Sequence, residues 1–190
     1  MTHLEIEYKS LLTKGEFQQL SHLFSHVPPV TQTNYYFDSE TFDMRANHMS
    51  LRIRTLPNHA ELTLKIPKAV GNLEYNQPLE LEVAKQMVKS NQLPTKVDFL
   101  ARIQEAGISL NQLRNYGSLT TVRREMLLDI GLLALDCNYY ADVKDYELEL
   151  EVTNAEQGKE DFERFLAEHQ IDFKYAKSKI ARFSSTLSQR

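Results

Sequence analysis

Charged and apolar residues alternate along most strand-like segments of this chain, and this alternation constrains its fold more than any other feature. The first example is the run His-Leu-Glu-Ile-Glu-Tyr-Lys, in which Glu5, Glu7 and Lys9 alternate with Leu, Ile and Tyr. Because successive side chains of a strand point to opposite faces, one face would be charged and the other could be buried. The charged face must then meet water or other charges, and a metal bound to a phosphate would satisfy both signs.

Later segments repeat the alternation, and several of them carry a single sign of charge. Arg52 and Arg54 share one face, as do Glu147, Glu149 and Glu151. Exposure to water is the simpler explanation for any one strand, but like charges at i and i+2 repel unless an ion of opposite sign lies between them. Arginine favours phosphate because its planar fork donates two hydrogen bonds at once. A row of glutamates favours a hard divalent cation, Mg²⁺ or Mn²⁺.

The order of elements predicts a β-rich fold built from antiparallel hairpins. A capping box at Thr13 and Glu16 predicts a helix that ends at the Pro28-Pro29 pair. The strands are expected at about residues 3–12, 32–38, 49–55, 61–66, 73–77, 119–129, 132–140 and 145–153. Further helices are expected from Pro78 and at about 99–106, 159–169 and 178–188. No low-complexity linker or internal repeat separates these segments, so residues 1–190 are predicted to form a single domain.

Composition narrows the class of protein. With 190 residues, of which 42% are hydrophobic and 25% charged, the chain can bury a core. The 22 basic and 26 acidic residues give a net charge of −4, which argues against a nucleic-acid partner. The one cysteine excludes an intramolecular disulfide and favours the cytoplasm. No segment approaches the roughly 18 apolar residues that a membrane helix needs, so no membrane partner is expected. The sequence does not distinguish a monomer from a homodimer.

The run Glu5-Ile6-Glu7-Tyr8-Lys9 resembles the ExExK signature of the CYTH domain, also called the triphosphate tunnel metalloenzyme superfamily. Its later landmarks follow in the expected order: two arginines at 52 and 54, Lys65 in Leu-Thr-Leu-Lys, a glutamate after a glycine turn, an arginine-bearing strand, Asp136, two glutamates at 147 and 149, and a lysine near the C-terminus. The resemblance covers essentially the whole chain and is strongest to small bacterial members of the Firmicutes type. It implies an α+β fold, with an eight-stranded antiparallel β-barrel that forms a tunnel, a charged lumen, and helices packed outside.

The resemblance also implies a role for each matching residue. The residues that would bind phosphate oxygens are Lys9, Arg52, Arg54, Lys65, Arg123 and a C-terminal lysine, for which Lys179 is preferred and Lys177 is second. The residues that would hold Mg²⁺ or Mn²⁺ are Glu5, Glu7, Glu74, Asp136, Glu147 and Glu149. Glu80 and Glu82 compete with Glu74, and Arg124 competes with Arg123. Glu5, Glu7, Lys9, Glu147 and Glu149 form the predicted catalytic set.

The resemblance implies a metal-dependent hydrolase acting on a small triphosphate. Inorganic triphosphate is the first expected substrate, followed by thiamine triphosphate and nucleoside triphosphates. A class IV type adenylate cyclase is one alternative, and a non-catalytic polyphosphate- or nucleotide-binding module is another. The chain lacks a GxxxxGK[ST] loop, so nucleotide binding by that route is not expected.

Overall fold

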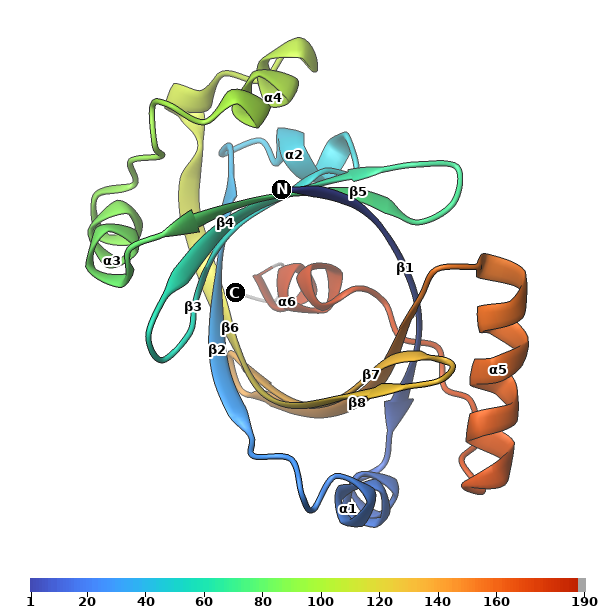
Figure 1. Cartoon of the computed structure of the whole chain (residues 1–190). Helices are drawn as coiled ribbons and strands as arrows, with labels where there is room; N and C mark the ends of the chain where they lie inside the picture. Colours follow the sequence, from blue (N-terminus) through green and yellow to red (C-terminus); the bar gives the residue numbers. More distant parts are fainter. Residues whose placement is uncertain (188–190) are drawn as a thin grey trace. The chain divides into compact units, whose positions relative to one another are not determined.

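The computed structural model describes residues 1–187, which contain eight strands and six α-helices (Figure 1). The strands are β1 (Thr2–Leu12), β2 (Val30–Asp38), β3 (Ser50–Thr55), β4 (Ala60–Pro67), β5 (Asn72–Leu79), β6 (Arg114–Leu128), β7 (Gly131–Tyr140) and β8 (Val143–Val152). The helices are α1 (Lys14–Leu23), α2 (Asp43–Ala46), α3 (Leu81–Ser90), α4 (Ala101–Glu105), α5 (Ala155–Glu168) and α6 (Lys179–Leu187), with short 3₁₀ helices at Asp98–Leu100 and Leu110–Gln112. Residue 188, to which the last helix is predicted to extend, lies outside the described residues.

The strands form a closed barrel in the order β1-β5-β4-β3-β2-β6-β7-β8, which confirms the predicted fold class. The pairings of β1 with β8, β2 with β3, β3 with β4, β4 with β5, β6 with β7, and β7 with β8 are all antiparallel. The chain also divides into two compact units. Unit 1 contains Met1–Leu4 and Gln32–Ser118, and unit 2 contains Glu5–Thr31 and Leu119–Arg190.

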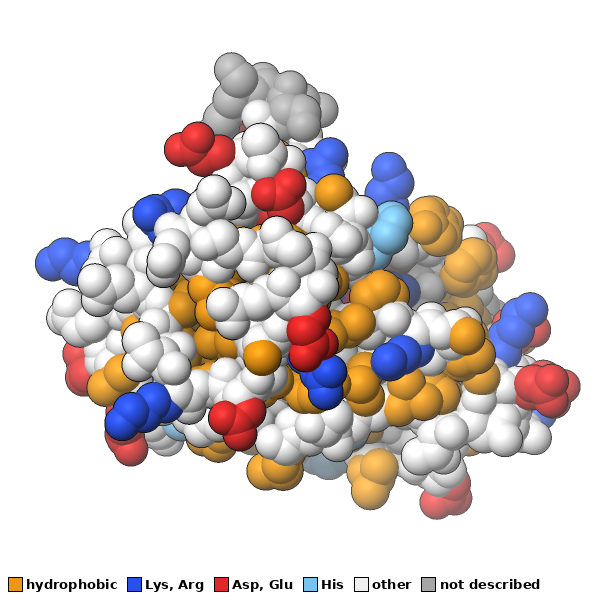
Figure 2. Space-filling model, turned by 90° about the horizontal axis from the view of Figure 1, so that it is seen from above, with side chains coloured by type: hydrophobic (Ala, Val, Ile, Leu, Met, Phe, Trp, Pro, Cys, Tyr) orange, Lys and Arg blue, Asp and Glu red, His pale blue; other side chains and the backbone are white. Residues whose placement is uncertain are grey.

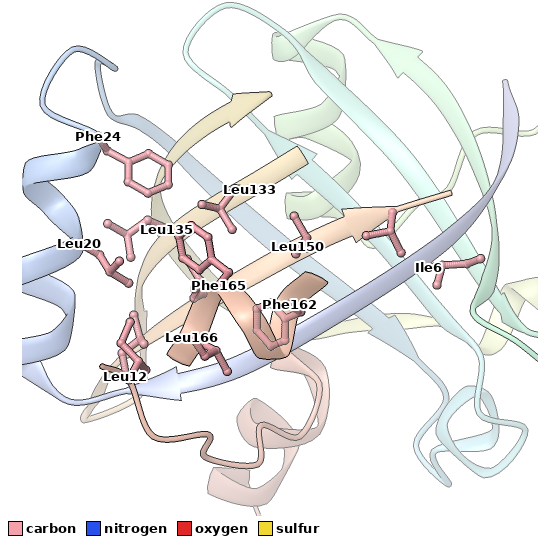
Figure 3. Close-up of a cluster of buried hydrophobic side chains, with 13 residues drawn as sticks. Ile6, Leu12, Leu20, Phe24, Leu133, Leu135, Leu150, Phe162, Phe165 and Leu166 are labelled. Atoms are coloured by element: carbon pink, nitrogen blue, oxygen red, sulfur yellow. The ribbon is translucent and has the colours of Figure 1, made fainter. Parts of the chain in front are cut away.

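Unit 2 buries the apolar face of its strands against helices. Leu148 and Leu150 of β8 are fully buried in a cluster that includes Phe162 and Phe165 of α5 and Leu20 of α1 (Figure 3). Burial of one such side chain stabilises the fold by about 1.5–3 kcal/mol. The predicted capping box begins α1, as expected, since the backbone N–H of the third helical residue and that of the cap both find side-chain acceptors. These contacts fix which face of β8 is apolar.

The last helix of unit 2 lies on the other face of the sheet. Figure 1 shows α6 on the side of β7 and β8 opposite to α1. Its Lys179 contacts Glu147 and Glu149, which alternate along β8 with the leucines of the core. Helix α6 therefore covers the charged face of these strands, whereas α1 and α5 cover the apolar face.

Unit 1 has a second core on the apolar faces of β3 and β4. Leu51, Ile53, Leu62 and Leu64 are fully buried in a cluster that also contains Ala84 of α3. This core is built by the hairpins that the alternation predicts. Each strand thus contributes one apolar face, as in unit 2.

The prediction that a helix begins at Pro78 is wrong, because Pro78 lies in β5 opposite Glu61 and α3 begins only at Leu81. The backbone N–H of Asn76 donates to the carbonyl of Met1, the first residue of the chain, at 2.8 Å. Residue 78 would point its backbone N–H to the same side as Asn76, away from β4, so a proline there removes no hydrogen bond of the β4–β5 pairing. The strand can therefore run through the proline.

Side chains of both charge signs are scattered over the face shown in Figure 2, with hydrophobic side chains among them. This mixture agrees with the small net charge of −4. Among the described helices, none combines the length and the apolar character that crossing a membrane would require.

Candidate functional site

Three buried carboxylates form the centre of the charged face in unit 2. Asp136 lies on β7, and Glu147 and Glu149 lie on β8, where Asp136 pairs directly with Glu147. Asp136 and Glu147 are fully buried and Glu149 is 8% exposed. One oxygen from each lies within 4.8 Å of the others. We call these three residues the carboxylate cluster.

Basic side chains from β6 and α6 contact the carboxylate cluster. Arg123 of β6 donates from Nε and Nη2 to the two oxygens of Asp136, at 2.8 and 2.7 Å, and also contacts Glu149. Lys179 Nζ lies 2.8 Å from Glu147 Oε1 and 2.9 Å from Asp136 Oδ2, and it also donates to Glu149. These contacts compensate the burial of charge, which is costly for a carboxylate without a partner.

The two glutamates of the cluster differ in proton affinity. Burial raises the pKa of Glu147 to about 7. Burial would also raise the pKa of Glu149, but Lys179 and Arg123 outweigh it and hold that pKa well below the usual range. Neighbouring like charges in a buried site separate pKa values in this way. The pair therefore combines a carboxylate that is ionised at neutral pH with one that titrates near it.

The first strand adds the ExExK residues to unit 2. Glu5, Glu7 and Lys9 share a face of β1, while Ile6 lies in the core. Lys9 donates to Glu7, and its Nζ lies 3.8 Å from a Glu149 oxygen, across the β1–β8 pairing. Burial lowers the pKa of Lys9, but Glu149 and Glu7 outweigh this effect and raise it overall. Lys9 therefore remains charged beside the cluster.

Unit 1 contains a separate set of charged residues on the polar face of β2 to β5. Arg54 Nε donates to Asn34 Oδ1 at 2.8 Å, and Arg54 Nη1 lies 3.5 Å from Glu61. Lys65 Nζ lies 3.0 Å from Glu74, its direct partner in the β4–β5 register. Burial would raise the pKa of Glu74, but Lys65 and Arg52 outweigh it and lower the pKa to about 2.

Two buried donors on this face of unit 1 have no acceptor. Arg52 Nε and Asn34 Nδ2 find no hydrogen-bond partner among the described residues. A buried donor without an acceptor costs about 1–3 kcal/mol, so such donors are rare unless a ligand satisfies them. An anion with several oxygens, such as a phosphate, fits this face.

The alternatives considered from the sequence occupy different environments. Glu74 is buried, whereas Glu80 and Glu82 are exposed at the start of α3. Lys179 contacts the carboxylate cluster, whereas Lys177 is exposed and contributes a carbonyl oxygen to Arg182 at 2.6 Å. The contacts of Arg123 with Asp136 and Glu149 likewise place it, rather than Arg124, beside the cluster.

Sequence reasoning missed Arg182 and Asp145. Arg182 of α6 donates to Glu147, and its Nε lies 3.2 Å from Asp145 Oδ2. Arg182 follows Lys179 by three residues, so the two side chains share a face of the helix. That spacing is the signal in the sequence that could have identified it.

The carboxylate cluster fits a divalent cation that prefers oxygen ligands. It supplies three carboxylates from two paired strands, the donor type that Mg²⁺ and Mn²⁺ prefer. Among the described residues it is the one group of three such side chains whose ligand atoms lie this close together. The chemistry of the donors therefore supports a metal site.

Comparison with known proteins gives one family over nearly the whole chain. The sequence model of the CYTH domain family matches residues 3–184. A Bacillus subtilis protein named "Putative triphosphatase YjbK" is 35% identical over 182 residues, which cover 95% of this chain and 94% of that protein.

Two solved structures are similar throughout. One, a Bacillus halodurans protein described as a "putative adenylate cyclase", is 33% identical with a TM-score of 0.88, and the match covers 96% of this chain and 98% of the other. The second is the Hippeastrum protein HpAC1, described as a "putative adenylyl cyclase" with "a dominant" triphosphatase activity. It is 27% identical with a TM-score of 0.81, and the match covers 96% of each chain.

Proposed function

Because this chain belongs to the CYTH domain family, we propose that it is a metal-dependent triphosphatase. The observation that carries the proposal is the buried carboxylate cluster of unit 2, together with the basic side chains that contact it. The Bacillus subtilis and Hippeastrum relatives are both described in terms of triphosphatase activity, which supports the same reaction here.

We propose the following division of roles. The residues that hold the cation are Asp136, Glu147 and Glu149, with Glu5, Glu7 and Glu74 as further acidic residues. The residues that bind phosphate oxygens are Lys9, Arg52, Arg54, Lys65, Arg123 and Lys179. A bound Mg²⁺ or Mn²⁺ would neutralise phosphate charge and lower the pKa of an attacking water. Lys177, the second choice for the C-terminal lysine, is less well supported than Lys179, because its side chain is exposed.

The protein's own contribution to this reaction would be positioning and charge neutralisation. Phosphoryl transfer demands little covalent chemistry from an enzyme, so aligned donors supply most of the acceleration. Arg52 offers a buried Nε without a partner, which can bind a phosphate oxygen at no cost in lost hydrogen bonds. Arg123 and Lys179 remain charged, since the carboxylates around them raise the pKa of each despite burial.

We propose inorganic triphosphate as the first substrate, with thiamine triphosphate and nucleoside triphosphates after it. The single, buried cysteine supports our placement of the protein in the reducing cytoplasm. The family match over residues 3–184 supports treating the chain as one functional domain. Adenylate cyclase activity is the second candidate, and it is favoured by the description of the Bacillus halodurans relative.

One experiment distinguishes these activities. Purified protein is incubated with tripolyphosphate, thiamine triphosphate or ATP in Mg²⁺ or Mn²⁺, and both phosphate and cyclic AMP are measured. We expect phosphate release from tripolyphosphate, and its loss in Glu149→Gln but not in Glu82→Gln, a matched change at an exposed glutamate of α3. Release of cyclic AMP without phosphate would favour the cyclase, and no product from any substrate would refute both.

A further inference from the structure

We propose that Arg182, anchored by Asp145, is a positioning residue that fixes the orientation of Glu147 in the carboxylate cluster. The inference rests on the cation site in the proposed function and adds to it a pair of residues outside the cluster. The contacts that support it are those of one guanidinium group, and all lie within unit 2.

Two nitrogens of the Arg182 guanidinium donate hydrogen bonds to the protein, and the third, Nε, forms an ion pair without a hydrogen bond. Nη2 donates to Glu147 Oε2, Nε lies 3.2 Å from Asp145 Oδ2, and Nη1 donates to the carbonyl of Lys177 at 2.6 Å. The side chain is only 10% exposed. A planar group held by two hydrogen bonds and an ion pair has little freedom to turn, so its contact with Glu147 is directional.

Asp145 is itself held by other donors. Its Oδ2 accepts from the hydroxyl of Tyr140 at 2.6 Å, and its Oδ1 accepts from Asn138 Nδ2 at 2.9 Å. Asn138 in turn accepts from the hydroxyl of Thr121 at 2.7 Å. These bonds lead from β6 across β7 to β8 and end at the anchor of Arg182. Asp145 is not part of the carboxylate cluster, so its contacts explain it better as an anchor than as a ligand.

The consequence is that the two oxygens of Glu147 are distinguished. Arg182 takes Oε2, whereas Oε1 accepts from Lys179, which also contacts the other members of the cluster. Glu147 is fully buried, so water cannot replace either partner. Arg182 therefore turns one defined oxygen toward the cluster. Lysine could not do the same, because it has a single nitrogen in place of a fork.

The test measures Mn²⁺ binding by calorimetry in the absence of triphosphate, and then kcat and KM for tripolyphosphate at saturating Mn²⁺. Arg182→Lys keeps the charge and removes the fork. We expect it to weaken Mn²⁺ binding by about 10- to 100-fold, the range for partners that orient metal ligands, and to lower kcat with KM unchanged. Unchanged Mn²⁺ binding in this variant would overturn the proposal, and so would a change confined to KM.

Arg182→Gln distinguishes the proposal from a competing explanation, because the two predict opposite changes in Mn²⁺ affinity. If Arg182 were only a positive charge that repels the cation, its removal would tighten Mn²⁺ binding. If it orients Glu147, removal weakens binding, as in Arg182→Lys. Tighter binding in Arg182→Gln would therefore overturn the proposal. The matched control is Arg164→Gln on α5, where the arginine is exposed and pairs with Asp161, and we expect it to leave Mn²⁺ binding unchanged.

If changes at Arg182 prevent folding, a variant that leaves Arg182 in place and changes no charge can still test the proposal. Tyr140→Phe removes one hydrogen bond from Asp145 without changing charge, so we expect a smaller loss of Mn²⁺ affinity. That loss should vanish in the Arg182→Lys background, because residues in one network are not additive, and fully additive losses would refute the relay. Wild-type protein that binds Mn²⁺ but hydrolyses no triphosphate would refute the proposed function alone. Absence of Mn²⁺ binding would refute this inference.

Discussion

Replacing Glu74 by glutamine should lower the free energy of unfolding by about 3 kcal/mol at pH 7. Lys65 and Arg52 lower the pKa of Glu74 from 4.5 to about 2 despite its burial. Each pKa unit corresponds to about 1.4 kcal/mol, so lowering the pKa from 4.5 to about 2 amounts to about 3 kcal/mol of stabilisation. Glutamine retains an oxygen for the hydrogen bond from Asn76 but loses the charge that Lys65 contacts at 3.0 Å.

The sign of the shift fixes the pH window. Because the folded-state pKa is lowered, the stabilisation is complete above the unfolded-state value of 4.5 and is lost as the pH falls toward 2. From these two pKa values, the difference in stability between wild type and Glu74→Gln should shrink to about 1 kcal/mol at pH 3. Unfolding in urea, followed by circular dichroism at pH 7 and pH 3, measures both differences.

Glu61→Gln is the matched control for this prediction. Glu61 lies on the neighbouring strand and pairs with Arg54 at 3.5 Å, but its side chain is 28% exposed. Pairs that water reaches contribute at most about 1 kcal/mol. Equal losses in Glu61→Gln and Glu74→Gln, or a Glu74→Gln difference that stays constant between pH 7 and pH 3, would refute the reasoning.

Three further changes probe the core, the phosphate site and the metal site. Gly158→Ala would place a Cβ 2.5 Å from Val152 Cγ2, so urea unfolding should show a loss of about 1–3 kcal/mol; failure of Val152→Ala to restore stability in the double variant would count against overpacking. Arg52→Ala should weaken binding of tripolyphosphate by about 1–3 kcal/mol in calorimetry, and an unchanged affinity would exclude it from the phosphate site. Glu5→Gln should abolish metal-dependent hydrolysis with an unchanged melting temperature, and normal turnover would remove Glu5 from the site.

The fold could be predicted from the sequence because polar and apolar residues alternate along each strand, so that each strand shows which of its faces is buried in the core. In β8, Glu147 and Glu149 alternate with Leu148 and Leu150, and the structure places the first pair in the carboxylate cluster and the second in the core. The alternation in Leu73-Glu74-Tyr75 likewise predicts a strand, and Glu74 is buried there, whereas Glu82 is exposed on a helix. Alternation identifies a face of a strand from local residues alone.

Features that depend on distant residues could not be predicted in this way. The extended conformation of Pro78 depends on the pairing of β5 with β4, where Pro78 lies opposite Glu61, and local propensity does not contain this pairing. Strand β6 begins at Arg114, whereas the prediction placed its start near residue 119. The prediction began too late because Gly117 interrupts the apolar pattern on which it rests. The role of Arg182 depends on the return of α6 to the charged face of β8. The pairing of Pro78 with Glu61 and the contact of Arg182 with Glu147 both join residues far apart in the chain.

The two faces of β8, one with carboxylates and one with leucines, also explain why its register is strongly specified. A shift by one residue would carry Glu147 and Glu149 to the apolar face and would expose two leucines to the basic side chains. Both faces oppose such a shift, since the core would receive unpaired carboxylates, which are costly to bury, and the cluster would lose its donors. Gly131 adds a local constraint: a Cβ there would lie 2.3 Å from the carbonyl oxygen of Glu151. Only a residue without a side chain permits this close approach of β7 to β8. Stability and the proposed chemistry therefore select the same register, so a substitution that loosens the core should also displace the carboxylates.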